Sequence, residues 1–310
     1  NMATHPEESS PDYLDSLQLL TTYKDWRTRL LTVTGDTSAA TALAARMSAQ
    51  IMAEYHQFWP ETVRGLLVHA AEWTPAMCPH SNQWPNSKSD AEKILRMYGY
   101  GVPNLAQALY SAKNSLTLIA QDSIQPYFKD EADKQRIKTN EMKLHDLPWP
   151  RDVLADLGET EVEMKVTLSY FIEPKPERNE VKRPSRYMSH GLRFEVKFPT
   201  ETPEQFRQRI NKAARAEEGN TVRSSGDSDK WLLGPTLRNR GCLHSDVWRG
   251  SAVELAAKSH IAVFPINGWW KELRRKKKHD SQTRYSLIVT IKTPDVDVDV
   301  YTPVSNLILV

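Results

Sequence analysis

The sequence has little of several features that mark specialised classes of protein. Its two cysteines, Cys78 and Cys242, lie too far apart for the paired spacing of a zinc site. No apolar run approaches the roughly 18 residues of a membrane span, and residues 1–16 are too acidic and polar for a secretory signal. A net charge of +2 disfavours general binding to nucleic acid or membrane surfaces. We therefore expect a cytoplasmic protein without cofactor or metal, whose thiols are reduced, although a disulfide between the two stays possible.

The sequence has enough apolar residues for a substantial core, and its first third is helical in pattern. Hydrophobic residues make up 39% of the 310 positions. Residues 37–55 are rich in alanine, with Leu43, Met47 and Ile51 at helical spacing, which predicts a helix buried on most sides. Pro60 suits the first turn of a second helix. Further helices are predicted up to about residue 97, with Ser89 or Asp90 as the cap, and again from Pro103.

The period of the apolar residues changes from about 3.6 to 2 near residue 112. Alternating segments that predict strands are 115–121, 161–173, 192–198, 260–266, 284–293 and 295–304. One amphipathic helix, 202–216, interrupts them. The pattern predicts an α+β protein in which a helical domain, residues 1–112, precedes an antiparallel β-sandwich, residues 113–310.

The segment Gly35-Asp36-Thr37-Ser38 stands just before the first alanine-rich helix. Ser38 has two readings here. Serine is a common N-cap, because its hydroxyl satisfies free backbone N–H groups. A serine at the positive end of a helix also suits acyl transfer, since the free N–H groups stabilise a developing oxyanion.

Three segments in the same order resemble the subtilases, the subtilisin-like serine peptidases. Thr37-Ser38-Ala39-Ala40 resembles the Gly-Thr-Ser-x-Ala nucleophile motif, 53–73 resembles the next helix of the family, and 98–109 resembles the Tyr-Gly-x-Gly segment that closes the peptidase domain. The resemblance covers about residues 17–112. It implies that Ser38 is the catalytic nucleophile, that the substrate is a peptide or protein, and that the early helices belong to a doubly wound α/β domain.

The resemblance also has departures. Asp36 stands where the family has glycine, and Ala42 where proline is common. The family's aspartate, histidine and oxyanion asparagine all precede the serine, and only 37 residues precede Ser38 here. The chain therefore resembles the C-terminal part of a subtilase, and we expect it to be inactive alone. Its second half looks like the β-rich extension of a bacterial subtilase group, which implies an ATPase of the AAA type as a possible partner.

A different class of function stays open beside the peptidase. The β-rich half could be a binding or regulatory module that docks a protein partner, with the serine helix as a remnant. The helices of residues 1–112 have apolar faces at Leu43, Met47, Ile51, Val63, Leu66 and Leu67. We expect these faces to pack on the sandwich or to pair in a homodimer.

Other residues have both a functional and a plain structural reading. His69 could replace the missing base, but a partly buried histidine with one hydrogen bond is the preferred reading. Cys78 and His80 are too few for a metal site, so a loop thiol is favoured. The alternating Asp295, Asp297 and Asp299 could hold calcium, although an exposed, charged strand face is favoured.

A basic run and two tryptophans lie close together late in the sequence. Residues 271–280 could contact phosphate groups, although a solvated loop is preferred. Trp269 and Trp270 could stack on bases, or serve as one core anchor and one residue at the rim of the sandwich.

Overall fold

The computed structural model describes residues 2–4, 11–13, 18–78, 85, 87–113, 117–130, 136–140, 142–175, 187–217 and 227–293. The chain forms two compact units, residues 1–57 and 58–310. The predicted helices at Pro60 and beyond therefore share a unit with the strands. The division at residue 112, drawn from composition, stays a prediction. The predicted strand 295–304 lies outside the described residues.

The first unit contains two strand pairs and one long helix. Strand β1 (Met2–Thr4) pairs with β2 (Pro11–Tyr13), and β3 (Leu19–Thr22) pairs with β4 (Leu31–Thr34), both antiparallel. Helix α1 (Asp36–Glu54) follows and confirms the predicted helix. Most of its described side chains are exposed, contrary to the prediction of burial on most sides. Alanine favours helix by its intrinsic propensity and needs no burial, which is why composition misled here.

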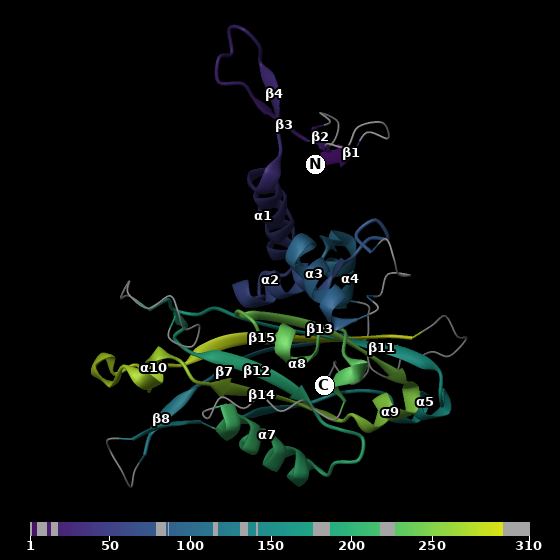
Figure 1. The fold of residues 1–310 in the computed structure, drawn as a ribbon, viewed down its shortest axis with the longest axis vertical. Helices are drawn as coiled ribbons and strands as arrows, with labels where there is room; N and C mark the ends of the chain where they lie inside the picture. Colours follow the sequence, from purple (N-terminus) through teal and green to yellow (C-terminus); the bar gives the residue numbers. More distant parts are fainter. Residues whose placement is uncertain are drawn as a thin grey trace. The chain divides into compact units, whose positions relative to one another are not determined.

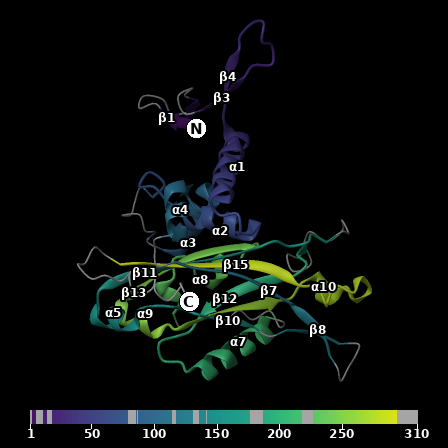
Figure 2. The ribbon, with the colours of Figure 1, turned by 180° about the vertical axis from the view of Figure 1, so that it is seen from behind.

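The second unit is built on two antiparallel sheets (Figures 1 and 2). The larger has the order β13-β11-β15-β7, and the smaller has the order β10-β14-β12. The strands of the larger sheet are β7 (Thr117–Ile124), β11 (Glu161–Tyr170), β13 (Leu243–Ser251) and β15 (Thr283–Lys292). Those of the smaller sheet are β10 (Lys143–Asp146), β12 (Gly191–Val196) and β14 (His260–Ile266). The α+β fold class is therefore confirmed.

Alternation along β11 explains how the main core forms. Val162, Met164, Val166 and Leu168 are buried on one face of this strand, because successive strand residues point to opposite faces. They share one hydrophobic cluster with buried residues of β12 and β14 in the smaller sheet. A common core between two sheets is what the predicted β-sandwich requires; the sandwich itself stays a prediction.

Helix α2 (Pro60–His69) packs on β15 and β11, and Figure 1 shows it against the larger sheet. Pro60 occupies its first turn, as predicted. Gly65 allows close approach, because a Cβ there would lie 2.9 Å from the Ile288 Cδ1 atom. Val63 and Leu66 are buried, so the prediction that the helices pack on the β-rich part holds for α2. The Gln121 side chain of β7 accepts a hydrogen bond from the Trp59 N–H at the start of the helix.

Helix α7 (Pro203–Glu217) confirms the predicted amphipathic helix, and it packs on β14. Phe206 and Ile210 of α7 contact Ala262 and Phe264 on the face of β14 turned away from the main core. Further elements of this unit are β5 (Ala71–Glu72), α3 (Lys88–Tyr98), β6 (Val102–Pro103), α4 (Leu105–Lys113), β8 (Tyr127–Lys129), β9 (Ile137–Thr139), α5 (Arg151–Asp156), α8 (Gly234–Arg238), α9 (Ala252–Ala257) and α10 (Trp269–Glu272). Helix α4 therefore starts at Leu105, two residues after the predicted Pro103, which pairs in β6.

Candidate functional site

Ser38 lies in the first turn of α1, directly after the β3–β4 hairpin. The N-cap of this helix is Gly35, so Ser38 is the third helical residue and the capping interpretation is wrong. Asp36 has φ of 59°, in the left-handed region that few residues other than glycine adopt readily. Aspartate is among the residues that tolerate this conformation best. The family glycine can therefore be replaced by aspartate without losing the sharp turn into the helix.

The surroundings of Ser38 suit an acyl-transfer nucleophile. Its side chain is exposed. The Ala39 N–H donates to the Gly35 carbonyl at 3.3 Å, the first hydrogen bond of the helix. The N–H groups before it, including that of Ser38, have no acceptor within the helix, and they lie at its positive end. The small neighbours Ala39 and Ala40 leave space beside the hydroxyl. The turn can therefore offer a hydroxyl and oxyanion donors from one short segment.

A general base for this hydroxyl is missing from the described part of residues 1–57. The one described histidine of this unit, His56, follows the far end of α1, and its Nδ1 atom lies 2.8 Å from the Met52 carbonyl oxygen. Sixteen positions at 1.5 Å rise place Glu54, the last residue of α1, about 24 Å from Ser38, and His56 follows beyond that end. His5 lies outside the described residues. Serine attacks poorly unless a base takes its proton.

His69 is a structural residue of the second unit. It is buried, its Nδ1 atom lies 2.9 Å from the Thr167 hydroxyl oxygen, and its Nε2 atom lies 2.7 Å from that of Thr290. Burial, together with the charges of Lys165 and Lys292, holds the pKa of His69 well below its ordinary value. The structural reading of His69 is confirmed, and it makes two polar contacts where one was predicted.

The remaining candidates have no described catalytic arrangement. Cys78 and Cys242 are free thiols, whereas His80 and the aspartates at 295, 297 and 299 lie outside the described residues. The described part of the chain brings together no group of three or more His, Cys, Asp or Glu side chains suited to a metal ion. None of its helices is long and apolar enough to cross a membrane.

The two tryptophans next to the basic run serve packing. Trp269 and Trp270 are both buried, with 1% and 7% of their surface exposed, in a cluster with Tyr127 and Ile137. The core-anchor reading is therefore right for Trp269, but Trp270 is also a core residue and not a rim residue. Within the basic run, the Lys278 ammonium pairs with the Glu173 carboxylate at 3.4 Å.

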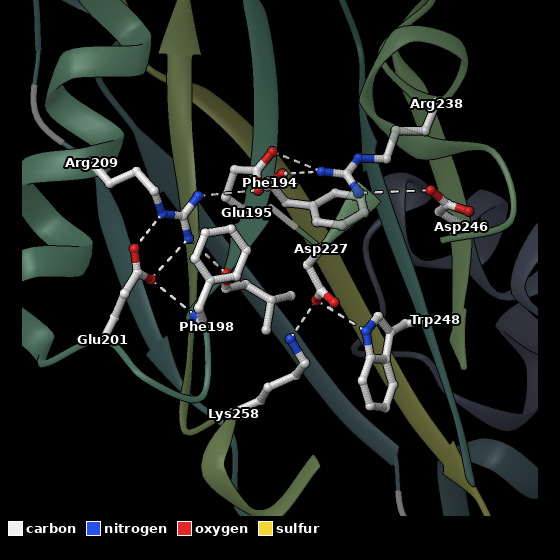
Figure 3. A network of polar contacts seen from close by, with 11 residues as sticks. Phe194, Glu195, Phe198, Glu201, Arg209, Asp227, Arg238, Asp246, Trp248 and Lys258 are labelled. Carbon is white, nitrogen blue, oxygen red and sulfur yellow. Dashed lines mark hydrogen bonds and ion pairs between the residues drawn. The ribbon is translucent and has the colours of Figure 1, made fainter. Parts of the chain in front are cut away.

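Buried charges join the smaller sheet to the elements around it. Figure 3 shows the Arg238 guanidinium between Glu195, at 2.8 Å, and Asp246, at 3.7 Å. In the same view the Asp227 carboxylate accepts hydrogen bonds from the Lys258 ammonium at 2.6 Å and the Trp248 indole at 3.0 Å. Arg238, Asp246, Trp248 and Lys258 are almost fully buried. We assign this network to stability, because each charge already faces a protein partner.

A cavity on the larger sheet was missed by sequence reasoning. It has a volume of about 180 Å³ and lies over the face of the sheet that also carries α2. Glu163 and Lys165 of β11 line it, on the opposite face from the apolar residues of that strand. The signal was present in the sequence, since charged residues alternate with the apolar ones in 161–166. A charged strand face is normally solvated, however, and only the structure shows that other elements wall it in.

Comparison with known proteins identifies one family. Residues 8–101 match the sequence model of the subtilase family of peptidases. The matched segment is less than a third of the chain, and it contains Ser38 and helices α1, α2 and α3. No curated protein matches the chain. The likeness to subtilases is thus shown for this segment and supports a subtilisin-like peptidase origin.

Proposed function

We propose that Ser38 is the nucleophile of a subtilisin-like serine endopeptidase that hydrolyses peptide bonds in proteins. The observation that carries this proposal is the position of Ser38. It is exposed in the first turn of a helix, after a left-handed Asp36, inside the segment that matches the subtilase family. A serine with a purely structural role at this place would be expected to cap the helix, and Gly35 occupies that position.

In the proposed mechanism, the Ser38 hydroxyl oxygen attacks the scissile carbonyl carbon while a histidine takes the hydroxyl proton. An aspartate orients that histidine. The Ser38 backbone N–H donates to the carbonyl oxygen as it becomes negatively charged, and the positive end of α1 stabilises the same charge. The histidine then protonates the leaving amine. Water repeats the sequence on the acyl-enzyme and frees Ser38.

The histidine and aspartate of this mechanism are not assigned to described residues. His56 is too far from Ser38, and the ring nitrogens of His69 are both engaged by threonines. We therefore propose that other parts of the complete gene product supply the base, the acid and a side-chain oxyanion donor. Residues 1–310 by themselves should then be inactive, as the carboxyl-terminal part of a subtilase.

Hydrolysis of a quenched fluorescent protein substrate tests this proposal. The complete translation product of the gene should cleave the substrate, and Ser38→Ala should lower kcat by several orders of magnitude, because the attacking atom is gone. Ser48→Ala is the matched control, since Ser48 lies on the same helix and donates to the Ala44 carbonyl. Equal activity of wild type and Ser38→Ala would overturn the assignment.

A second candidate function is a non-catalytic, protein-binding module in residues 58–310. The observation that favours it is the cavity on the larger sheet, which belongs wholly to this unit. The family resemblance suggests an ATPase of the AAA type as the partner. The apolar helix faces suggest a second copy of the chain. Co-purification from the native cell separates the two functions. A partner that co-purifies with the Ser38→Ala protein, and that the wild-type protein does not cleave, supports the module.

A further inference from the structure

The cavity on the larger sheet has an ordered charge pattern. Strand register places Glu163 between Arg249 and Lys292, so these three side chains form one row across β13, β11 and β15. The next row on the same face places Lys165 between Val247 and Thr290. The other walls come from the end of α2, from residues 71–73, from Tyr100 and Gln107, and from Leu232 and Leu233. With about 180 Å³ the cavity is far larger than the roughly 10–15 Å³ that admits one water molecule.

Two of the three cations in the cavity are neutralised by glutamates. The Arg249 Nε atom donates to the Glu163 carboxylate at 2.6 Å. The Lys292 ammonium donates to the Glu72 carboxylate at 2.5 Å. Lys165 differs, because the acceptor that its ammonium reaches among the described residues is the neutral Ala71 carbonyl oxygen, at 2.7 Å. An ammonium has three donors and a full positive charge, so one cation and two N–H groups remain for a ligand.

The other polar groups around the cavity already have partners. His69 is neutral between its two threonines. The Asp246 carboxylate accepts hydrogen bonds from the backbone N–H groups of Leu233 and Gly234 at 2.8 and 2.9 Å. The Tyr100 hydroxyl donates to the Leu243 carbonyl at 3.1 Å. The cavity therefore presents a single positive charge beside two aromatic side chains, Trp73 and Tyr100.

We propose that this cavity binds a carboxylate-bearing ligand with an apolar or aromatic portion, and that Lys165 holds its carboxylate. One uncompensated cation matches the single negative charge of a carboxylate. A phosphate carries more charge and would face Glu72 and Glu163 without enough cations to offset them. Trp73 and Tyr100 give the apolar portion a surface. The inference goes beyond the peptidase proposal and does not depend on Ser38.

The protonation of Lys165 gives the site a pH dependence. The pKa of Lys165 is lowered to about 8, chiefly by burial and also by the charge of Lys292, against the opposing charges of Glu72 and Glu163. The titratable and charged groups that line the cavity with it are His69, Glu72, Tyr100, Glu163, Asp246, Arg249 and Lys292. Burial raises the pKa of Tyr100 to about 12 and lowers that of His69, so neither changes charge between pH 7 and 9. Affinity for a carboxylate should fall about tenfold over that interval, because Lys165 loses its charge.

Calorimetric titration of residues 1–310 with N-acetylphenylalanine and with its neutral amide tests the proposal. The acid should bind and the amide should not. Lys165→Met should weaken binding of the acid about 10- to 100-fold, because a charged hydrogen bond is lost. Lys212→Met is the matched control, since Lys212 is exposed on α7. Ser38→Ala should bind the acid as wild type does, which separates this test from that of the peptidase.

Two further experiments identify the source of the carboxylate and replace the Lys165→Met variant if it does not fold. A pentapeptide that ends in phenylalanine, with a free or an amidated terminus, shows whether the ligand is a peptide C-terminus or a small organic acid. If Lys165→Met unfolds, the wild-type pH profile and Lys165→Arg, which keeps the charge, replace it. Equal binding of acid and amide, or no binding of either, would overturn the proposal.

Discussion

Residues 18–57 and 58–310 differ in how far they bury their apolar side chains. In the second unit, helices and two sheets bury a large aliphatic and aromatic core. In the first, the β3–β4 hairpin leaves Leu20, Trp26 and Leu30 with 68%, 69% and 70% of their surface exposed. The segment that matches the subtilase family extends over both. The nucleophile candidate therefore lies where little is buried, and the stability of the chain comes from residues that mostly lie outside the match.

The contrast explains which parts of the family segment are held in place by the β-rich half. Helix α2 is fixed through Arg64, whose guanidinium donates to the Tyr170 carbonyl at 2.7 Å and the Cys242 carbonyl at 3.0 Å. Ser38 depends instead on local features, namely Gly35, Asp36 and the helix they start. A change in the core of residues 58–310 should thus lower stability, whereas a change at Ser38 should alter chemistry alone.

The largest effect on stability should come from the buried charges of the second unit. Arg238→Met keeps most of the side-chain volume but removes the cation that faces the buried Asp246, and it leaves Glu195 with Arg209 at 3.5 Å. We expect the free energy of unfolding to fall by about 3–5 kcal/mol. Arg46→Ala, on the exposed face of α1, should change it by no more than about 0.5 kcal/mol. Urea unfolding followed by circular dichroism measures both, and a loss below about 1 kcal/mol for Arg238→Met would contradict the comparison.

Truncation of leucines gives a second contrast between the two units. Leu66 of α2 has none of its surface exposed, whereas Leu30 in the first unit is 70% exposed. Leu66→Ala should lower the free energy of unfolding by about 2–5 kcal/mol, because a cavity forms under the helix. Leu30→Ala should leave it within about 0.5 kcal/mol. Similar losses from both changes would show that the hairpin has a core of its own.

Acid should destabilise the second unit through its buried histidines. Burial lowers the pKa of His190 to about 3 and that of His244 to about 4, and it lowers the pKa of His69 as well. In the unfolded chain these residues titrate near 6.5, so below that pH the unfolded state binds more protons and stability is lost as pH falls. Each histidine should contribute about 1 kcal/mol of loss between pH 7 and 5.5.

Unfolding in urea at the two pH values measures this loss. His244→Gln should reduce the difference between pH 7 and 5.5 by about 1 kcal/mol, whatever it does to stability at pH 7. His56→Gln is the matched control, because His56 is exposed in the first unit, and it should leave the difference unchanged. An unchanged difference in His244→Gln would refute the assignment.

The smallest effects should come from two serines at helix starts. Ser87 is the N-cap of α3, and its hydroxyl accepts a hydrogen bond from the Asp90 N–H at 3.1 Å. Ser87→Ala should cost about 1 kcal/mol of stability. Ser38→Ala should cost less than about 0.5 kcal/mol, since Ser38 is not a cap and alanine favours helix. Thermal unfolding of the two variants measures the difference, and equal losses would restore the capping role of Ser38.

Sequence patterns were most informative where one face of an element is apolar. The strands β11, β14 and β15 and the helix α7 follow such patterns and were predicted. Strand β13 was not, because His244 and Asp246 replace apolar residues on its buried positions. Tertiary hydrogen bonds and ion pairs satisfy these groups, and a sequence does not show them. The cap of α3 is Ser87 and not the predicted Ser89 or Asp90, because several serines and aspartates compete there.

The two candidate sites, at Ser38 and at Lys165, also differ in how far the sequence predicts them. Ser38 was found from sequence because its segment is local: turn, nucleophile and helix follow one another along the chain. Lys165 was not found, because its surroundings come from elements as distant in sequence as Ala71 and Lys292. Lys165 is notable because its neighbours Arg249 and Lys292 pair with glutamates. Strand register places Arg249 beside Glu163, whereas Lys292 meets Glu72 of another sheet through a tertiary ion pair.

The most direct test of the central claim is covalent labelling of the complete gene product in a native-cell extract with a fluorophosphonate, followed by mass spectrometry of the labelled peptide. The probe reacts with a serine whose hydroxyl is activated by a base. We predict a single stoichiometric label on Ser38, abolished by Ser38→Ala, and no label on isolated residues 1–310. A complete product that is folded but unlabelled at Ser38, or one labelled equally at another serine after Ser38→Ala, would contradict the account.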